Sequence, residues 1–539
     1  MKKSVLILGA GLMQKPAIQA AKSLGFYTYV VDANPDAECV PLADEFCKID
    51  LKERGEIFKY AETLSKTENL KGIFTAGTDF SASVSYASEK LGLPSHSFES
   101  SLNASIKPRM RACFAKCGVP SPEYFSFSGS EITEKTITEA INKLGFPCVV
   151  KPADNMGARG CRMIRNMGEA WSSVCVAKDN SRTQTVIIEN YMDGPEFSID
   201  ALVYNGTMTI TGFADRHIYF PPYFIETGHT MPVQIEENKK LELIKTFAEG
   251  VKALGLTCGA AKADIKYTEK GPEIGEIAAR LSGGYMSGWT FPYSSDVNLT
   301  EEALLIATGN IPEKLLSKRV KLPVKTDSFE LYDLPSVKVS AERAWISIPG
   351  KIREVLGFSE AEKISGIKNI FQRPVKIGDY VDFPRNNVSK CGNVISQCEN
   401  YDDAVNASQE AVSKIIIRLE PNEEVTEKFL SGTEAADEKG FPPCAYKSFY
   451  KIFDLCLKGK ISENSSILKD IENDEKLLNI FEYTEKSWNH LTAMETVKMF
   501  DKLCSVHPAL DRKRFYSALL KGGIQAAIYV SDSEADSEN

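Results

Sequence analysis

The sequence of 539 residues is too long for one compact core, so several domains are expected. Its 43% hydrophobic and 25% charged residues are typical of a globular protein. The net charge of −9 argues against nucleic acid as a partner, because neutralising phosphates requires clustered lysine and arginine.

The cysteines and the N-terminal segment indicate in which cellular compartment the protein is expected. Thirteen cysteines are scattered through the chain without a regular framework. The N-terminal apolar run breaks at Gly9 and continues into polar Gln14 without a small-residue cleavage site. No stretch approaches the length of a membrane span. We therefore expect a cytoplasmic protein without a membrane partner.

The first hundred residues alternate between strands and helices. Ser4–Leu8 and Tyr27–Val31 are apolar runs typical of buried parallel strands, with a helix at Ala17–Leu24 between them. A third strand at Gly72–Thr75 precedes a turn and another helix. This order predicts an α/β domain with an open, doubly wound sheet.

A glycine pair follows the first predicted strand. Gly9 and Gly11, with Asp32 at the end of the second strand, are part of a dinucleotide-binding pattern, but Gln14 stands where its third glycine belongs. We favour a tight strand-to-helix turn or a polar substrate pocket. A nicotinamide-dependent oxidoreductase stays open as an alternative.

Three segments downstream supply groups that ATP binding requires. The apolar strand before Lys151 delivers a cation, and the glycine-containing loop after it lets backbone amides approach phosphate oxygens. The strand Thr185–Ile188 runs into a segment that can present backbone groups and carboxylates to adenine and ribose. The predicted ATP-binding residues of these segments are Lys151, Gly157, Ala158, Arg159, Gly160, Glu189, Asn190, Tyr191, Met192 and Glu196.

Two further carboxylates, Asp264 and Glu276, are predicted metal ligands. Strands joined by the turn around Gly271 would form a hairpin that brings them side by side. Such carboxylates repel unless a cation lies between them, and Mg²⁺ (or Mn²⁺) bridging to phosphate is the usual answer. Arg280 lies an even number of residues after Glu276, so an extended chain would point both to one face. We expect Arg280 to steady a transferring phosphoryl group.

In this order and spacing, the motifs within about residues 1–420 resemble the ATP-grasp superfamily. The resemblance is closest to the branch of biotin carboxylase, carbamoyl phosphate synthetase and the L-amino-acid ligases. It implies an ATP-grasp fold, α+β in its central domain, behind an N-terminal doubly wound domain. It also implies that Lys107 binds phosphate and that Arg280 is catalytic. Many members place an asparagine metal ligand two residues after the second carboxylate, where this chain has Ala278.

The resemblance implies an ATP-dependent ligase acting on a small carboxylate and an amine. The γ-phosphoryl group of ATP would pass to the carboxylate, and the amine would attack the acyl phosphate, releasing ADP and phosphate. Two alternatives stay open. One is a bicarbonate-phosphorylating enzyme of the carbamoyl-phosphate-synthetase or carboxylase type, and the other is a non-catalytic ATP-binding regulatory module.

Residues for the second substrate lie in two other segments. Arg216 could clamp a carboxylate, and His229 could orient or deprotonate an amine, because histidine titrates near neutrality. The segment around His229 resembles the E-x-G-H-x-x-P stretch that lines the acceptor pocket of amino-acid ligases, which adds Glu226. Ser282 and Gly283 are expected to approach the acyl phosphate.

The chain is predicted to have five parts. The N-terminal domain at 1–104 precedes a nucleotide-binding domain at 105–312 and a strand-rich part of the ligase core at 313–430. A mainly helical accessory domain is expected at 431–530, and a disordered acidic tail at 531–539. The helical part fits an interaction domain, a cap on the active site or a dimerisation element, so a homodimer stays open.

Overall fold

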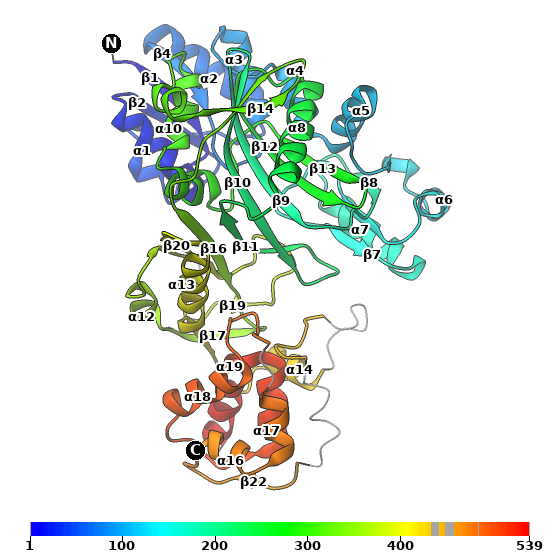
Figure 1. Ribbon diagram of the computed structural model, residues 1–539, viewed down its shortest axis with the longest axis vertical. Helices are drawn as coiled ribbons and strands as arrows, with labels where there is room; N and C mark the ends of the chain where they lie inside the picture. The colour runs from blue at the N-terminus through cyan, green and yellow to red at the C-terminus, as the bar shows by residue number, and fades with distance from the viewer. Residues whose placement is uncertain (1, 374, 433–440, 448–456, 483–484, 538–539) are drawn as a thin grey trace. The chain divides into compact units, whose positions relative to one another are not determined.

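The computed structural model describes residues 2–373, 375–432, 441–447, 457–482 and 485–537 (Figure 1). The chain divides into two compact units, which are described separately. The first comprises Met1–Ile218, His229–Ala341 and Gln397–Tyr401. The second comprises Tyr219–Gly228, Glu342–Ser396 and Asp402–Asn539.

The first unit begins with a parallel four-stranded sheet in the order β3–β2–β1–β4, which confirms the predicted N-terminal sheet. Val5 and Ile7 pack in the core that includes α1, whereas Leu6 and Leu8 pack in the core that includes α2. Helices therefore cover both faces, which explains why β1 is wholly buried. The elements are β1 (Ser4–Leu8), α1 (Lys15–Ser23), β2 (Tyr27–Asp32), β3 (Glu45–Lys48), α2 (Arg54–Thr67), β4 (Leu70–Phe74), α3 (Ser81–Leu91) and α4 (Phe98–Ser105).

The glycine pair near the N-terminus forms a tight turn. Gly9 has a φ of +104°, which few other residues adopt. Asp32 Oδ2 accepts the N–H of Ala10 at 2.8 Å, and the buried Gln14 Oε1 accepts that of Ala76 at 3.0 Å. Because Asp32 holds the backbone of this loop and Gln14 ties the segment to Ala76, the geometry favours the turn over a dinucleotide loop.

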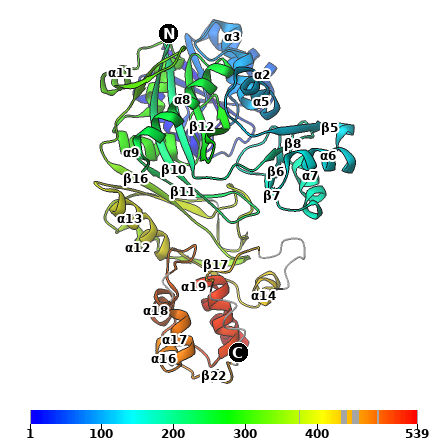
Figure 2. The same cartoon turned by 45° about the vertical axis from the view of Figure 1, so that its right-hand side comes forward.

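A smaller antiparallel sheet has the order β5–β8–β6–β7, with α6 and α7 beside it (Figure 2). Its apolar face shares a core with both helices, around Ile141, Val150 and Val174. The elements are β5 (Tyr124–Ser128), α6 (Glu134–Leu144), β6 (Cys148–Pro152), β7 (Arg162–Ile164), α7 (Ala170–Asp179) and β8 (Thr185–Asn190).

The larger antiparallel sheet of the first unit contains β13–β12–β9–β10. Its apolar face packs on α5 and α8 through residues such as Ile199, Ile265 and Ile277. The elements are α5 (Lys107–Cys117), β9 (Glu196–Tyr204), β10 (Thr207–Tyr219), β11 (Ile225–Met231), α8 (Glu237–Leu254), β12 (Gly259–Thr268) and β13 (Gly271–Ala278). Downstream lie α9 (Phe291–Ser295), α10 (Leu299–Ala307), α11 (Glu313–Lys318), β14 (Val320–Lys325), β15 (Glu330–Asp333) and β16 (Val339–Trp345).

The second unit combines short strands with the expected C-terminal helices. Its strands are β17 (Gly350–Leu356), β18 (Ile367–Gln372), β19 (Tyr380–Val381), β20 (Gly392–Cys398), β21 (Ile416–Leu419), β22 (Lys460–Ile461) and β23 (Leu510–Asp511). Its helices are α12 (Phe358–Glu362), α13 (Tyr401–Lys414), α14 (Glu424–Ser431), α16 (Ile467–Glu472), α17 (Glu475–Phe481), α18 (Ala493–Leu503) and α19 (Arg512–Ser537). They share an apolar core that contains Phe429, Phe481 and Phe500. Among the described residues, no helix is long and apolar enough to cross a bilayer.

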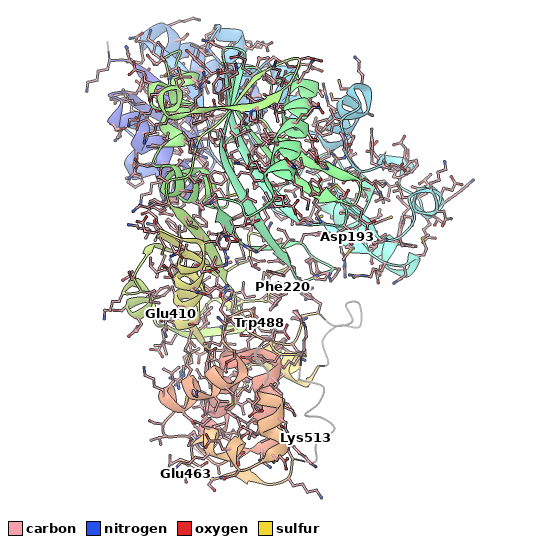
Figure 3. The ribbon with its side chains drawn as sticks, viewed as in Figure 1. Asp193, Phe220, Glu410, Glu463, Trp488 and Lys513 are labelled. Atoms are coloured by element: carbon pink, nitrogen blue, oxygen red, sulfur yellow. The ribbon has the colours of Figure 1, made fainter. Side chains whose placement is uncertain are left out.

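An aromatic cluster also belongs to the second unit. The Phe383 ring centroid lies 5.1 Å from that of Phe220 and 5.1 Å from that of Trp488. Phe220 and Trp488 are labelled in Figure 3. The edge-to-face arrangement of these rings is the favourable one for aromatic pairs. The geometry accounts for Trp488 as a packing residue.

The expectation of a disordered tail at 531–539 is wrong for residues up to Ser537, which belong to α19. The carboxylate of Asp532 lies 2.5 Å from Arg418 Nη2, and that of Glu534 lies 2.6 Å from Arg514 Nη1. These arginines neutralise the acidic charges, so the helix can continue. Residues 538–539 lie outside the described part, and the remaining domain boundaries stay predictions.

Candidate nucleotide and metal site

A hairpin places two carboxylates side by side. β12 and β13 are antiparallel, and their register sets Asp264 directly opposite Glu276. A bulge follows Asp264 and shifts the register of the remaining pairs. The predicted hairpin is confirmed, whereas the metal-binding role of its carboxylates stays a prediction.

One face of this sheet is lined with polar side chains. Residues 196, 198 and 200 of β9 lie opposite residues 266, 264 and 262 of β12. Because side chains alternate between the faces of a sheet, all six lie on one face. That face carries Glu196, Ser198, Asp200, Lys262, Asp264 and Lys266.

Cations neutralise the carboxylates of this face. Lys262 Nζ lies 2.5 Å from Asp264 Oδ2, and Arg216 Nη1 lies 2.6 Å from Asp264 Oδ1. Arg216 Nη1 is also 2.5 Å from Glu196 Oε1, and Lys266 Nζ is 3.6 Å from Glu196 Oε2. Arg216, expected to clamp a substrate carboxylate, thus lies between two carboxylates of the predicted nucleotide site.

Lys107 faces the second metal-ligand candidate. It begins α5, where Pro108 suits the first helical turn, and its Nζ lies 3.6 Å from Glu276 Oε2. Burial would raise the pKa of Glu276, but Lys107, Lys262 and nearby cations lower it to about 2. Conversely, burial lowers the pKa of Lys107, and Glu276 raises it above its usual value. Both groups are therefore charged at neutral pH.

Glu189 holds two cations in the interior. Its Oε1 accepts from Arg111 Nε at 2.8 Å, and its Oε2 lies 2.6 Å from Lys151 Nζ. Burial would raise the pKa of Glu189, but Arg111 and Lys151 lower it below its usual value. Arg111 also donates to the Gly275 carbonyl at 2.6 Å and so joins the two antiparallel sheets. Arg111 was not among the predicted site residues, although its position four residues after Lys107 placed both on one face of α5.

The glycine-containing loop lies between β6 and β7. Gly157, Ala158 and Gly160 have φ angles of +68°, +58° and +69°. A Cβ added at Gly160 would lie 2.8 Å from Asn180 Cβ, so the position requires glycine. Arg159 Nε donates to the Met156 carbonyl at 3.1 Å and closes the loop on itself.

The segment after β8 lies against the larger sheet. Lys266 Nζ donates to the Met192 carbonyl at 3.1 Å and lies 4.7 Å from the centroid of the Tyr191 ring. The N–H groups of Asn190 and Tyr191 donate to the carbonyls of Glu123 and Pro147. The structure thus brings the predicted adenine segment to the polar face that carries Asp264.

Arg280 lies beyond the end of β13. The strand stops at Ala278, so the extended chain expected to carry Arg280 does not continue. Arg280 Nε lies 3.8 Å from Asp79 Oδ1, and its Nη1 donates to the Leu281 carbonyl at 3.0 Å. Its charge still helps to lower the pKa of Glu276, so the guanidinium acts on the same site.

The next loop is held by a buried carboxyl. The N–H of Ser282 donates to Asp200 Oδ2 at 3.0 Å. Burial raises the pKa of Asp200 to about 6, although the Ser282 bonds and Lys262 act in the opposite direction. A Cβ added at Gly283 would lie 3.2 Å from the Gly77 carbonyl oxygen, so the N-terminal domain approaches this loop. Asp200 was not predicted as a site residue either, although polar residues alternate with apolar ones at the start of β9.

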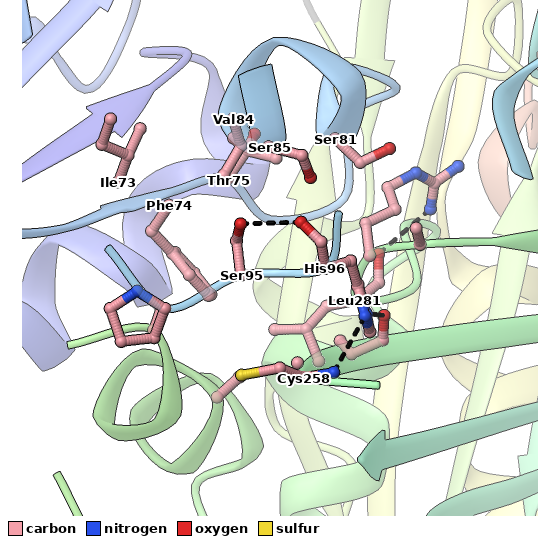
Figure 4. Close-up of a pocket in the computed structure, with 17 residues that line it drawn as sticks. Ile73, Phe74, Thr75, Ser81, Val84, Ser85, Ser95, His96, Cys258 and Leu281 are labelled. Atoms are coloured by element: carbon pink, nitrogen blue, oxygen red, sulfur yellow. Dashed lines mark hydrogen bonds between the residues drawn. The ribbon is translucent and has the colours of Figure 1, made fainter. Parts of the chain in front are cut away.

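A cavity lies behind this loop, lined by residues that include Ile73, Phe74 and Leu281 (Figure 4). His96, which also lines it, accepts the N–H groups of Thr257 and Cys258 at Nδ1, each at 3.1 Å. Burial lowers the pKa of His96 to about 4, so the ring is neutral. Its Nε2 lies 2.9 Å from the Ala260 carbonyl and donates to it. His96 therefore joins the N-terminal domain to β12.

The two acceptor candidates fall in different units. His229 is buried in β11 and belongs to the first unit. Glu226 belongs to the second, where its N–H donates to Asn387 Oδ1 at 2.8 Å and its carbonyl accepts from Lys390 Nζ at 2.7 Å. An acceptor pocket lined by both residues stays a prediction.

The metal candidates fit a magnesium–nucleotide site. Within the described residues, no group of three or more His, Cys, Asp or Glu could form a metal cage. Mg²⁺ at nucleotide sites usually takes one or two carboxylates together with substrate phosphates. Asp264 and Glu276, which are register partners on neighbouring strands, supply two carboxylates for that mode.

Family models match two parts of the chain. The ATP-grasp domain matches residues 144–288, and the L-amino acid ligase C-terminal domain 2 matches residues 344–420. The first range contains Lys151, the glycine-containing loop, both opposed carboxylates and Arg280.

Relatives and solved structures agree with these matches. Carnosine synthase 1 of Gallus gallus is 24% identical over 332 residues, which is 58% of this chain and 36% of that protein. Alanine–anticapsin ligase of Bacillus subtilis is 24% identical over 300 residues, 51% of this chain and 61% of that one. The chain therefore spans less than two thirds of either relative.

The fold is similar to that of the L-amino acid ligase from Bacillus licheniformis. The TM-score is 0.64 at 18% identity, covering 78% of this chain and 100% of the other. This likeness supports the expected ATP-grasp fold. The motifs and the match to the ATP-grasp domain show that the chain is a member of the ATP-grasp superfamily, and the structural likeness shows that it has the ATP-grasp fold.

Proposed function

We propose that this enzyme phosphorylates a small carboxylate with Mg-ATP and joins the resulting acyl phosphate to an amine, releasing ADP and phosphate. The opposition of Asp264 and Glu276 on a face lined with cations carries the proposal. ATP brings several negative charges, which the cations of this face and a divalent ion would neutralise together.

The nucleotide would be held by residues of both antiparallel sheets. Lys107 and Lys151 would contact phosphates, and the backbone of residues 157–160 would cover them. Residues 189–192 would border the adenine, and Glu196 would accept from the ribose. The buried Glu189 carboxylate already binds Lys151, so its role is to position that lysine. The backbone of the segment would then recognise the base.

Asp264 and Glu276 would hold Mg²⁺ or Mn²⁺. When bound, the ion would neutralise phosphate charge and orient the γ-phosphoryl group. Arg280 would stabilise the negative charge that develops on the transferring group. Its contact with Asp79 restrains the guanidinium beside the site.

The reaction needs no covalent enzyme intermediate. A substrate carboxylate oxygen attacks the γ-phosphorus, the bond to the β,γ-bridging oxygen breaks, and ADP leaves. The amine nitrogen then attacks the acyl carbon, and phosphate leaves as the C–O bond breaks. His229 would take the amine proton, while the Ser282 and Gly283 backbone would face the acyl phosphate.

Amino acids are the substrate class that we favour for both positions. The match to the L-amino acid ligase C-terminal domain 2 and the likeness to alanine–anticapsin ligase support them over bicarbonate. Arg216 would act on the nucleotide side of the site, where it pairs with Glu196 and Asp264, and a substrate contact by Glu226 stays a separate prediction. A homodimer stays a separate prediction, which light scattering would check.

A screen of ADP release over pairs of amino acids, with products identified by mass spectrometry, would test the proposal. We expect ADP, phosphate and an amide product in equal amounts for at least one pair. Bicarbonate-dependent ADP release without an amine would instead indicate the carboxylase-like alternative. Nucleotide binding without any turnover would indicate a regulatory module.

A further inference from the structure

Arg216 contacts two carboxylates that the proposed function assigns to different parts of Mg-ATP. Its Nη1 donates to Glu196 Oε1 at 2.5 Å and lies 2.6 Å from Asp264 Oδ1. The first carboxylate is the predicted ribose acceptor, and the second is a predicted metal ligand. The Arg216 side chain is only 9% exposed, so these contacts are shielded from solvent. One buried guanidinium therefore holds an oxygen of both groups.

The other oxygen of Asp264 also faces a cation. Lys262 Nζ lies 2.5 Å from Oδ2, so both oxygens of this carboxylate contact positive groups. A divalent ion that binds Asp264 would have to displace at least one of them, because three positive groups around one carboxylate repel one another strongly in a poorly screened interior. Lys262 comes from the same strand as Asp264, whereas Arg216 reaches across from β10 and contacts β9 on the way. Arg216 is thus the cation that joins the predicted ribose and metal contacts.

We propose that Arg216 couples metal binding to nucleotide binding by moving from Asp264 to a phosphate oxygen of ATP, which frees the carboxylate oxygen for the divalent ion. The inference rests on the proposed function, in which Glu196 contacts the ribose and Asp264 the metal. A guanidinium has five N–H donors in a planar fork that matches phosphate oxygens. Arg216 therefore exchanges one anionic partner for another and is not left as an unpaired buried charge.

Charge balance favours this exchange only when both ligands are present. A divalent ion alone would add positive charge beside Lys262 and would offer no anion to the displaced guanidinium. Nucleotide alone would draw Arg216 away and leave Asp264 close to phosphates of the same sign. Together, the triphosphate attracts the guanidinium while the ion lies between phosphate and carboxylate. Each ligand therefore raises the affinity for the other, and linkage requires that the two factors be equal.

Measuring each affinity with and without the other ligand gives the size of this coupling. We would titrate the full-length enzyme with Mn²⁺, with and without the non-hydrolysable analogue AMP-PNP, and follow free Mn²⁺ by electron paramagnetic resonance. Calorimetry would give the affinity for AMP-PNP in Mn²⁺ and in EDTA. The coupling factor is the ratio of the Mn²⁺ dissociation constants without and with AMP-PNP. We expect this factor to be about tenfold larger in the wild-type enzyme than in Arg216→Met.

The variants separate the specific contact from a general charge effect. Without nucleotide, Arg216→Met should bind Mn²⁺ more tightly than the wild-type enzyme, because Asp264 is no longer shared with the guanidinium. It should bind AMP-PNP more weakly, because a phosphate contact is lost. Arg216→Gln, which is also uncharged, should behave in the same way. Lys266→Met is the matched control, since Lys266 lies on the same face but contacts Glu196 and the Met192 carbonyl.

The control variant should keep the wild-type coupling factor, and circular dichroism would verify that each variant is folded. An unchanged factor in folded Arg216→Met and Arg216→Gln would overturn the inference, as would an equal fall in Lys266→Met. Mn²⁺ binding that tightens by the same factor with and without AMP-PNP would also overturn it, because only the lost charge would then matter. If the factor falls as expected but no substrate pair yields ADP, the ligase proposal fails and the coupling stands.

Discussion

Replacing Arg111 with methionine should destabilise the junction of the two antiparallel sheets by about 3 kcal/mol. Arg111 is 1% exposed and Glu189 is 2% exposed, so the variant leaves a buried carboxylate without one of its two cations. Removing one partner of a buried ion pair costs about 3–5 kcal/mol. We take the lower end because Lys151 remains 2.6 Å from Glu189.

The same helix offers a matched control. Arg109 pairs with Glu99, but these side chains are 38% and 71% exposed. An exposed ion pair contributes only about 0–1 kcal/mol, so Arg109→Met should change little. The comparison keeps the residue type, the helix and the substitution constant while burial differs.

Hydrogen exchange of the amides in β6 and β8 measures the local opening free energy of this sheet. Arg111→Met should speed their exchange by about 10²-fold, because each 1.4 kcal/mol is a factor of about ten. The double variant Arg111→Met/Glu189→Gln should recover part of the loss, since the orphaned charge is gone. If Arg111→Met exchanges no faster than Arg109→Met, burial does not set the strength of this pair and the reasoning is wrong.

Three further predictions concern the site. Glu276→Gln should abolish ADP release and weaken Mn²⁺ binding, whereas Glu273→Gln on the same strand should stay within about twofold of wild type in a coupled assay; equal loss in both would contradict the assignment. Asp200 is expected to ionise near 3.8 when unfolded and at about 6 when folded, so the folded state binds more protons between these values and stability falls as pH rises. Relative to Asp200→Asn, the wild-type protein should lose about 3 kcal/mol across that window in urea unfolding, and parallel pH profiles would refute the shift. Gly160→Ala should raise the KM for ATP about tenfold because its Cβ meets Asn180, while Gly129→Ala, left-handed but in open space, should not; similar kinetics in both would show that the loop tolerates a side chain.

Local sequence was sufficient to predict the parts of the site whose contacts join residues close together along the chain. Asp264 and Glu276 could be paired from the sequence because a short turn joins their strands and sets the register. Lys151 and the glycines at 157 and 160 belong to one strand and the loop that follows it. The family resemblance depends on the same order and spacing, so the ATP-grasp assignment was available before the fold.

Only the tertiary structure decided which distant residues complete the site. Arg111 and Glu189 are 78 positions apart, and Arg280 meets Asp79 from another domain. Lys262 and Asp200 are neighbours only because β9 and β12 pair in this register. Strand pairing and packing between domains determine these neighbours, and neither leaves a periodic signal in the segments themselves. The residues expected to bind ATP can thus be recognised from local sequence motifs. The charged residues that surround them are determined by the strand faces and domains that the fold brings together.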